Sequence, residues 1–141
     1  RGGEGVVAVD RPLVVGSADP PGEMTLTILP FRSPERSADR MRSLVNRARR
    51  RAGLGELRSN EALDRAAEDL LWYGSPGGDT DGEFLRGENL GKGPSVEEVL
   101  GYMMVSAYQR RHILSRRWTR FGAGVVREGD LVRVALIFEG D

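Results

Sequence analysis

Apolar residues recur at three- and four-residue steps in three segments of the chain, which predicts three amphipathic helices. The first is expected to begin at residues 33–34, a serine cap followed by proline, and to end at Gly53. The second begins near Asn60 and stops before Gly74, and the third begins at Ser95 with a capping box. The expected buried stripes are Met41, Leu44, Val45, Ala48 and Ala52; Leu63, Ala66, Ala67, Leu70 and Leu71; and Val96, Val99, Leu100, Met103, Met104 and Ala107.

Alternation of apolar and polar residues predicts strands near both ends of the chain. Residues 121–125 read F-G-A-G-V, a strand whose small residues let another element pack closely on one face. A turn at 128–130 then leads into a second strand, which predicts a hairpin with Val132, Val134, Leu136 and Phe138 at alternating positions. Residues 1–32 carry short apolar runs and are expected to be short strands or a linker added to the domain.

Arginine-rich segments separate some of these elements. Residues 115–120, which follow the apolar pair Ile113 and Leu114, are predicted to be an exposed basic loop. In the first helix most of the arginines at 47, 49, 50 and 51 fall off the apolar stripe. We interpret them as a solvated face rather than an anion-binding patch.

Composition narrows the class of protein. A chain of 141 residues fits one domain with a real core, and the absence of cysteine excludes disulfides and thiol catalysis. The 21 basic and 21 acidic residues balance, so the net charge does not favour a nucleic acid as a partner. No apolar run is long enough to span a membrane. We expect a monomer without a nucleic-acid partner. The chain begins at Arg1, which we interpret as a processed or trimmed start.

The stretch 106–125, SAYQRRHILSRRWTRFGAGV, resembles a motif of the CAP superfamily, the secreted domains related to cysteine-rich secretory and plant pathogenesis-related proteins. Bacterial members read W-M-x-S-P-G-H-R-x-N-I-L, followed by F and then G-x-G. Ser106 matches the serine of this motif and Arg110 its arginine. The helical stretch 44–67 and the tetrapeptide G-E-N-L at 87–90 also resemble the family, and the matches cover residues 34–138.

The resemblance implies a fold and a cleft. The fold is α+β, a three-layer α-β-α sandwich with a small, mainly antiparallel sheet, here in residues 33–141. In the family, the glutamate matched by Glu88 faces a central cleft and the asparagine matched by Asn89 braces the backbone. Both cleft histidines of the family are replaced: Gln109 fills one slot and Tyr73 the other, while His112 takes an asparagine slot.

These replacements bear on metal chemistry. A catalytic zinc ion needs three protein ligands, and glutamine and un-ionised tyrosine are poor ones. We therefore predict no metal site and no cofactor. Residues 77–88 partly resemble a calcium-binding loop through Asp79, Asp81 and Glu88, but Gly77 replaces its first ligand, so we interpret them as a polar turn.

The sequence therefore predicts a bacterial CAP-like domain, secreted or bound to the cell envelope, with no catalytic residue. Its cleft is expected to contain Glu88, Gln109, Tyr73, Tyr108 and His112. A peptide or peptidoglycan fragment, a sugar and a lipid are the candidate ligands, because aromatic rings beside polar groups suit such molecules. A pure scaffold role remains open, and the alternative is a divalent-metal-dependent hydrolase that uses Glu88.

Overall fold

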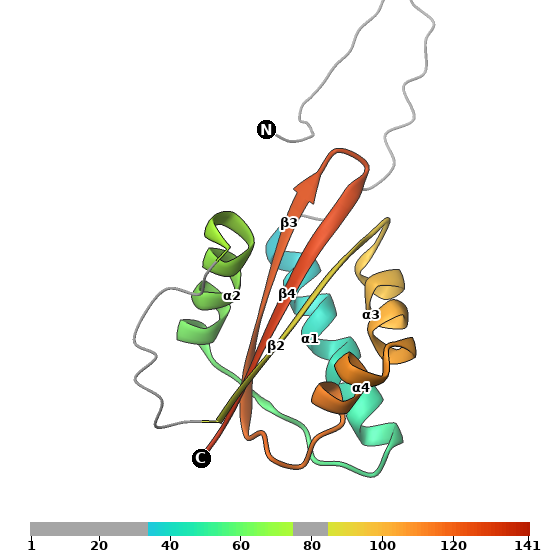
Figure 1. Ribbon diagram of the computed structural model, residues 1–141, viewed down its shortest axis with the longest axis vertical. Helices are drawn as coiled ribbons and strands as arrows, with labels where there is room; N and C mark the ends of the chain where they lie inside the picture. The colour runs from blue at the N-terminus through green and yellow to red at the C-terminus, as the bar shows by residue number, and fades with distance from the viewer. Residues whose placement is uncertain (1–33, 75–84) are drawn as a thin grey trace, which may run out of the picture. The chain divides into compact units, whose positions relative to one another are not determined.

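The computed structural model describes residues 34–74 and 85–141, and these contain four helices and four strands (Figure 1). The N-terminal strands or linker predicted for residues 1–32 lie outside the described part. Within that part, no helix is long and apolar enough to cross a membrane. In chain order the elements are α1 (Pro34–Arg51), β1 (Arg58–Ser59), α2 (Glu61–Tyr73), β2 (Leu85–Gly93), α3 (Val96–Val105), α4 (Ala107–Ile113), β3 (Arg120–Glu128) and β4 (Leu131–Gly140).

The strands form one sheet in the order β1-β3-β4-β2. β3 and β4 are the predicted hairpin, with Gly129 at a positive φ of 63° in its turn, and β2 pairs antiparallel with the other side of β4. The two-residue strand β1, which the sequence pattern did not predict, pairs in parallel with the start of β3. The sheet is therefore mainly antiparallel, as expected, and β2 lies at one edge of it.

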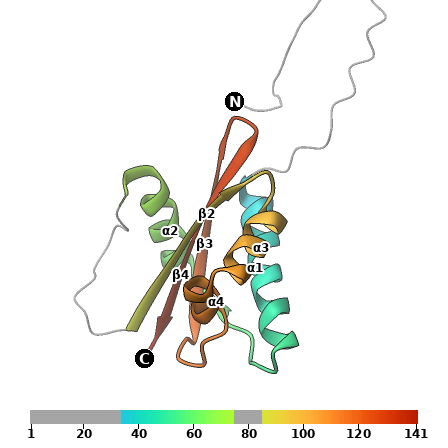
Figure 2. The same ribbon diagram turned by 45° about the vertical axis from the view of Figure 1, so that its right-hand side comes forward.

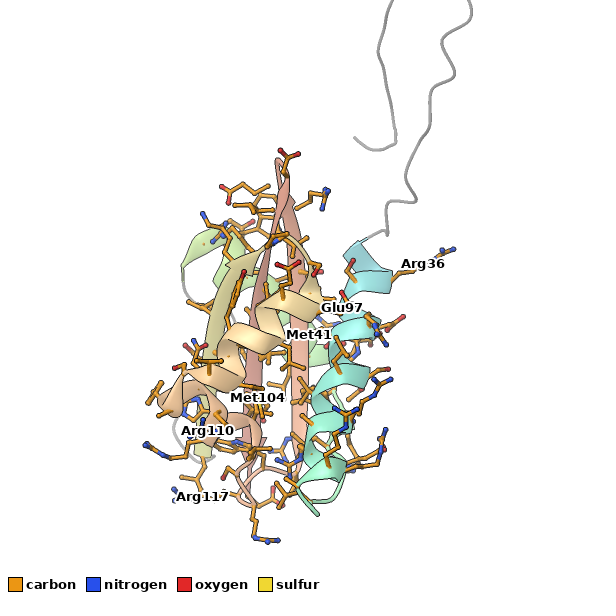
Figure 3. All side chains as sticks on the ribbon, turned by 90° about the vertical axis from the view of Figure 1, so that its right-hand side faces the viewer. Arg36, Met41, Glu97, Met104, Arg110 and Arg117 are labelled. Atoms are coloured by element: carbon orange, nitrogen blue, oxygen red, sulfur yellow. The ribbon has the colours of Figure 1, made fainter. Side chains whose placement is uncertain are left out.

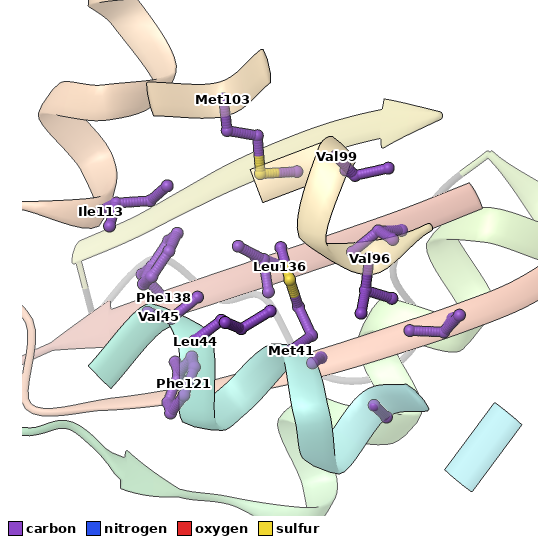
Figure 4. Packing of buried hydrophobic residues seen from close by; sticks show 14 of the residues in the cluster. Met41, Leu44, Val45, Val96, Val99, Met103, Ile113, Phe121, Leu136 and Phe138 are labelled. Carbon is purple, nitrogen blue, oxygen red and sulfur yellow. The ribbon is translucent and has the colours of Figure 1, made fainter. Parts of the chain in front are cut away.

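Helices cover both faces of the sheet, with α2 on one face and α1, α3 and α4 on the other (Figures 1 and 2). Figure 3 looks onto the layer of three helices. Side chains of α1 and α3 meet alternate residues of β3 and β4 in the larger core, which includes Met41, Val99, Phe121, Leu136 and Phe138 (Figure 4). Ala135 and Ile137 face α2 instead. The predicted three-layer α-β-α sandwich is confirmed.

Helix boundaries follow the predicted caps. The Asn60 side chain accepts a hydrogen bond from the Leu63 amide at the start of α2, and Gly74 ends that helix with a left-handed φ of 75°. The Ser95 hydroxyl accepts from the Glu98 amide at the start of α3. The predicted buried face of α2 is confirmed in full. Ala52 and Ala107 are exposed, because Ala52 follows the last residue of α1 and Ala107 lies beyond α3, at the start of α4.

The small residues of β3 allow close packing, as predicted. A Cβ atom added to Gly122 would lie 2.2 Å from the backbone carbon of Leu63, and one added to Gly124 would lie 2.8 Å from the amide nitrogen of Glu68. Side chains at these two positions would therefore push α2 away from the sheet.

A fourth helix corrects the sequence interpretation. The third helix was expected to continue through Ala107, but it ends at Ser106, whose ψ of 118° is extended. The Ser106 hydroxyl then caps α4 by accepting a hydrogen bond from the Gln109 amide at 3.4 Å. The chain thus changes direction at Ser106 and carries the residues after it back across β2.

Two residues of the arginine-rich segments are buried, contrary to prediction. Arg49 is 3% exposed, and its guanidinium donates to the carbonyls of Gly55, Ile113 and Ser115 at 2.8 Å each. Trp118 is 8% exposed and lies in the larger core. Three carbonyl acceptors compensate the burial of the arginine, so it joins α1 to the end of α4.

Candidate functional site

The motif at 87–90 lies on the edge strand β2, where successive side chains point to opposite faces of the sheet. Gly87 and Asn89 face the helix layer and are buried, while Glu88 alternates with them and is exposed. A Cβ atom at Gly87 would lie 2.8 Å from Cζ2 of Trp118 and 3.3 Å from Cε1 of His112. Glycine at 87 therefore lets the two rings approach the strand.

Asn89 is fully buried and connects β2 to α4. Its Nδ2 donates to the carbonyl oxygen of Gln109 at 3.0 Å, and its Oδ1 lies 2.8 Å from Nδ1 of His112. Because the amide oxygen can only accept, Nδ1 of the histidine must carry the proton. The amide of Asn89 thus fixes the tautomer of the chain's one histidine.

Gln109, which was predicted to fill a histidine position of the CAP motif, hydrogen-bonds the main chain. Its Nε2 donates to the carbonyl oxygen of Leu90 at 2.8 Å. On the next residue, Nη1 of Arg110 donates to the carbonyl of Met104 at 3.2 Å. These two bonds hold α4 against the edge strand and against the end of α3.

His112 lies among aromatic rings. The Tyr108 ring centroid is 4.7 Å away and that of Trp118 is 6.0 Å away, and the Trp118 indole donates to the His112 carbonyl at 2.7 Å. Burial lowers the pKa of His112; a hydrogen bond with the Glu88 backbone acts in the opposite direction, and the charge of Arg111 lowers it again. The imidazole is therefore neutral at neutral pH.

Four of the predicted site residues lie together: Asn89, Gln109, His112 and Tyr108. Glu88 adjoins them in the chain, with its side chain on the opposite side of the strand. Tyr73 ends α2 and is 78% exposed. Within the described part of the chain, no hydrogen bond or ring contact joins Tyr73 to the other four.

The end of α2 can be placed along β2. Arg133, which pairs with Lys92, donates to the carbonyl of Leu71 in the last turn of α2. Lys92 is four residues from Glu88. The last turn of α2 therefore lies beside a point on β2 that is roughly 13 Å along the strand from Glu88. The inclusion of Tyr73 in the cleft stays a prediction.

Metal-binding groups are sparse here. Within residues 34–74 and 85–141, no three histidine, cysteine, aspartate or glutamate side chains gather closely enough to hold an ion. Most of the calcium-like loop, residues 77–84, lies outside the described part. Glu88 is the one carboxylate among the predicted cleft residues.

Trp118 is the residue near this site that the sequence interpretation missed. It packs on Gly87, stacks on Phe138 at a centroid distance of 5.9 Å, and bonds to the backbone of His112. The available signal was a lone tryptophan in the basic run S-R-R-W-T-R. A large apolar ring is seldom left in water unless it serves a contact.

No family model matches the chain, and no curated protein matches it by sequence. Solved structures do match. A cysteine-rich secretory protein from Staphylococcus aureus superposes with a TM-score of 0.68 at 19% identity, over 79% of this chain and 41% of that one. An outer surface protein from Borrelia burgdorferi gives 0.64 at 13% identity, over 77% and 95%. An extracellular SCP-domain protein from Bacillus anthracis gives 0.63 at 18% identity, over 77% and 41%.

The match covers less than half of two of these proteins, at 41% of each. At such identities the similarity concerns the fold alone. The chain therefore has the fold of the CAP superfamily, which its sequence motifs predicted.

Proposed function

We propose that this domain is a non-enzymatic binding module that works outside the cytoplasm, and that it takes a small polar ligand beside Glu88 and Tyr108. The observation that carries the non-enzymatic part of the proposal is that the side chain of Gln109 is hydrogen-bonded within the protein. Its side-chain amide donates to the backbone of Leu90, and Asn89 and His112 hydrogen-bond to each other. These groups support a structural role, because their donors are already satisfied within the protein.

The surface beside this network carries the groups that suit a ligand. Tyr108 is 61% exposed on α4. Glu88 is exposed on the other side of the edge strand β2, so a ligand that touches both residues passes around this edge of the sheet. A tyrosine ring offers stacking surface to a sugar or peptide, and a carboxylate accepts hydrogen bonds from hydroxyl and amide groups. We therefore propose a peptidoglycan fragment, which contains both sugar and peptide, as the ligand class.

Chemistry at Glu88 has little support from its neighbours. General acid–base assistance alone gives only about 10²- to 10⁴-fold, so hydrolysis would need a second group that acts on the substrate. His112 is engaged with Asn89 through its protonated nitrogen. The extracytoplasmic location is supported by the structural neighbours, which include an extracellular protein and an outer surface protein.

Ligand-observed saturation-transfer NMR with a soluble muropeptide tests the proposal. We expect transfer to sugar and peptide protons, and a signal reduced several-fold in Glu88→Gln and in Tyr108→Ala. Glu68→Gln is the matched control, because Glu68 is an exposed carboxylate on α2.

Other outcomes would contradict the proposal. Silence from muropeptide and lipid probes alike supports a pure scaffold, and transfer from lipid micelles alone supports a lipid carrier. Cleavage of the muropeptide that is abolished in Glu88→Gln would establish the hydrolase alternative.

A further inference from the structure

A pocket of about 660 Å³ opens between the start of β2, helix α4 and the loop that follows α4. Its volume is in the range of small-molecule sites, which is roughly 300–1,000 Å³. None of Glu88, Gln109, Tyr108 and Tyr73 lines it. The pocket is therefore separate from the surface of the proposed function, although His112 forms part of its wall.

The polar wall of this pocket is basic, and no acidic side chain is among its described lining residues. Its basic members are Arg86, Arg110, Arg111, His112 and Arg117. Figure 3 shows Arg110 and Arg117 at the same end of the three-helix layer. Four guanidinium groups around one hollow repel one another unless an anion lies between them.

Most of this positive charge is not neutralised within the described part of the chain. Arg86 alone is paired, through Nε and Nη2 to Glu139 at 3.2 and 2.5 Å, and the same carboxylate also accepts from Arg120. Arg110 donates to a backbone carbonyl, and no described acidic side chain pairs with Arg111 or Arg117. The chain as a whole has zero net charge, so this excess is local.

Arg86 supplies a second, independent observation. Its Nη1 atom is buried and has no hydrogen-bond partner in the described structure. A buried donor without an acceptor costs free energy, and because Arg86 lines the pocket, a small shift of its side chain would bring this N–H group to an oxygen bound there. The lowered pKa of His112, to which the charge of Arg111 contributes after burial, reports the same positive field.

We infer that this pocket binds the phosphate group of an organic phosphate ester. One arginine fork satisfies both oxygens of a carboxylate, whereas a phosphate group has oxygens for two or more forks and carries more charge to balance them. The organic part of the ester packs on the apolar wall, which is formed by Leu85, Ala107, Leu114 and Trp118. A free ester and a phospholipid headgroup present the same chemistry to these arginines.

Trp118 provides the readout, because the chain has two tryptophans and the other, Trp72, is exposed on α2. In a Trp72→Phe background, sn-glycerol 3-phosphate at ~0.15 M NaCl is expected to change the Trp118 fluorescence saturably. Arg111→Ala and Arg117→Ala each remove one charge-assisted contact, and each should weaken binding about tenfold. The double variant should weaken binding about a hundredfold. Arg47→Ala is the charge-matched control, since Arg47 is exposed on α1 and does not line the pocket. Thermal unfolding of every variant verifies that it is folded.

Two arms distinguish the source of the phosphate. Saturable binding of sn-glycerol 3-phosphate assigns a soluble ester, and binding only to vesicles that contain phosphatidylglycerol assigns a lipid headgroup. Either result supports the inference if the double variant loses binding and Arg47→Ala keeps it. Equal weakening by Arg47→Ala, an unchanged affinity in the double variant, or no binding in either arm would overturn it. The muropeptide experiment is independent of these outcomes, because it reads a different surface.

Discussion

Arg49 connects three backbone carbonyls that belong to two separate segments of the chain. Gly55 lies in the loop after α1, while Ile113 and Ser115 lie at the end of α4. A buried cation with three acceptors is tolerated, but the same three carbonyls without it lose their partners. Burial lowers the pKa of Arg49, and the nearby charge of Arg116 adds to this, but an arginine remains protonated.

Replacement of Arg49 by alanine should therefore destabilise the domain. We expect Arg49→Ala to reduce the free energy of unfolding by about 2–4 kcal/mol, because several charge-assisted hydrogen bonds are lost and carbonyls stay buried. Urea denaturation followed by circular dichroism measures the change. Arg47→Ala, an exposed arginine on the same helix, should change stability by less than about 0.5 kcal/mol. Similar losses in both variants would refute the structural role of Arg49.

At the scale of elements, the contact between β3 and α2 depends on two glycines. The backbone of α2 lies so close to Gly122 and Gly124 that a methyl group has no space at either position. Gly101 is a helical glycine in α3 with nothing within 4 Å of its Cβ position. The two kinds of glycine therefore respond to alanine in opposite ways.

Gly122→Ala should cost about 2 kcal/mol or more, because α2 must move away from the sheet. Gly101→Ala should raise stability by about 0.5–1 kcal/mol, since alanine favours the helix. Thermal and urea denaturation of the two variants measure both changes. If Gly122→Ala is as stable as the parent protein, the close approach of α2 to β3 is wrong.

At the scale of the whole molecule, stability between pH 5 and 8 depends on one side chain, because the chain contains a single histidine. Folding lowers the pKa of His112, chiefly by burial. The unfolded chain therefore binds a proton more readily than the folded one. The free energy of unfolding falls as the pH drops below about 6.5, the unfolded value, and is fully recovered above it.

His112→Gln removes this titration. We expect the parent protein to lose stability between pH 8 and pH 5 and the variant to show a much flatter profile, with lower stability at pH 8 because the bond to Asn89 is altered. Urea denaturation at a series of pH values provides the comparison. A parent profile as flat as that of the variant would show that folding leaves the pKa unchanged.

Local sequence predicted much of this architecture. The caps at Asn60 and Ser95 and the stop at Gly74 are local signals, and each is found where expected. The hairpin and the glycine pair of β3 were also predicted, because alternation and small residues are properties of short segments. The break at Ser106 was missed, since the apolar spacing continues through it and only the packing of α4 onto β2 reveals the turn.

Residues with long-range partners were harder to predict. Neither the arginines near Arg49 nor the basic run near Trp118 differs in local pattern from a solvated segment. Arg49 is buried because carbonyls more than sixty residues away accept its hydrogen bonds, as the separation of 64 residues to Ile113 shows. In the candidate site, the motif resemblance placed Gln109 and His112 in one cleft and gave Asn89 a separate bracing role. The hydrogen bonds that join Asn89 to Gln109 and His112 are found only in the structure, and the assignment of Tyr73 stays a prediction.

The sequence by itself determined three of the four described helices and the hairpin, because hydrophobic period and capping are properties of short segments. The replacement of the cleft histidines stays a prediction from the motif resemblance. The tertiary structure alone decided which polar groups meet. It directed the Gln109 amide to the backbone of Leu90, buried Arg49 and Trp118, and gathered four arginines around one pocket. The physical reason is that hydrogen bonds and charges act through space over a few ångströms, whatever distance along the chain separates their partners.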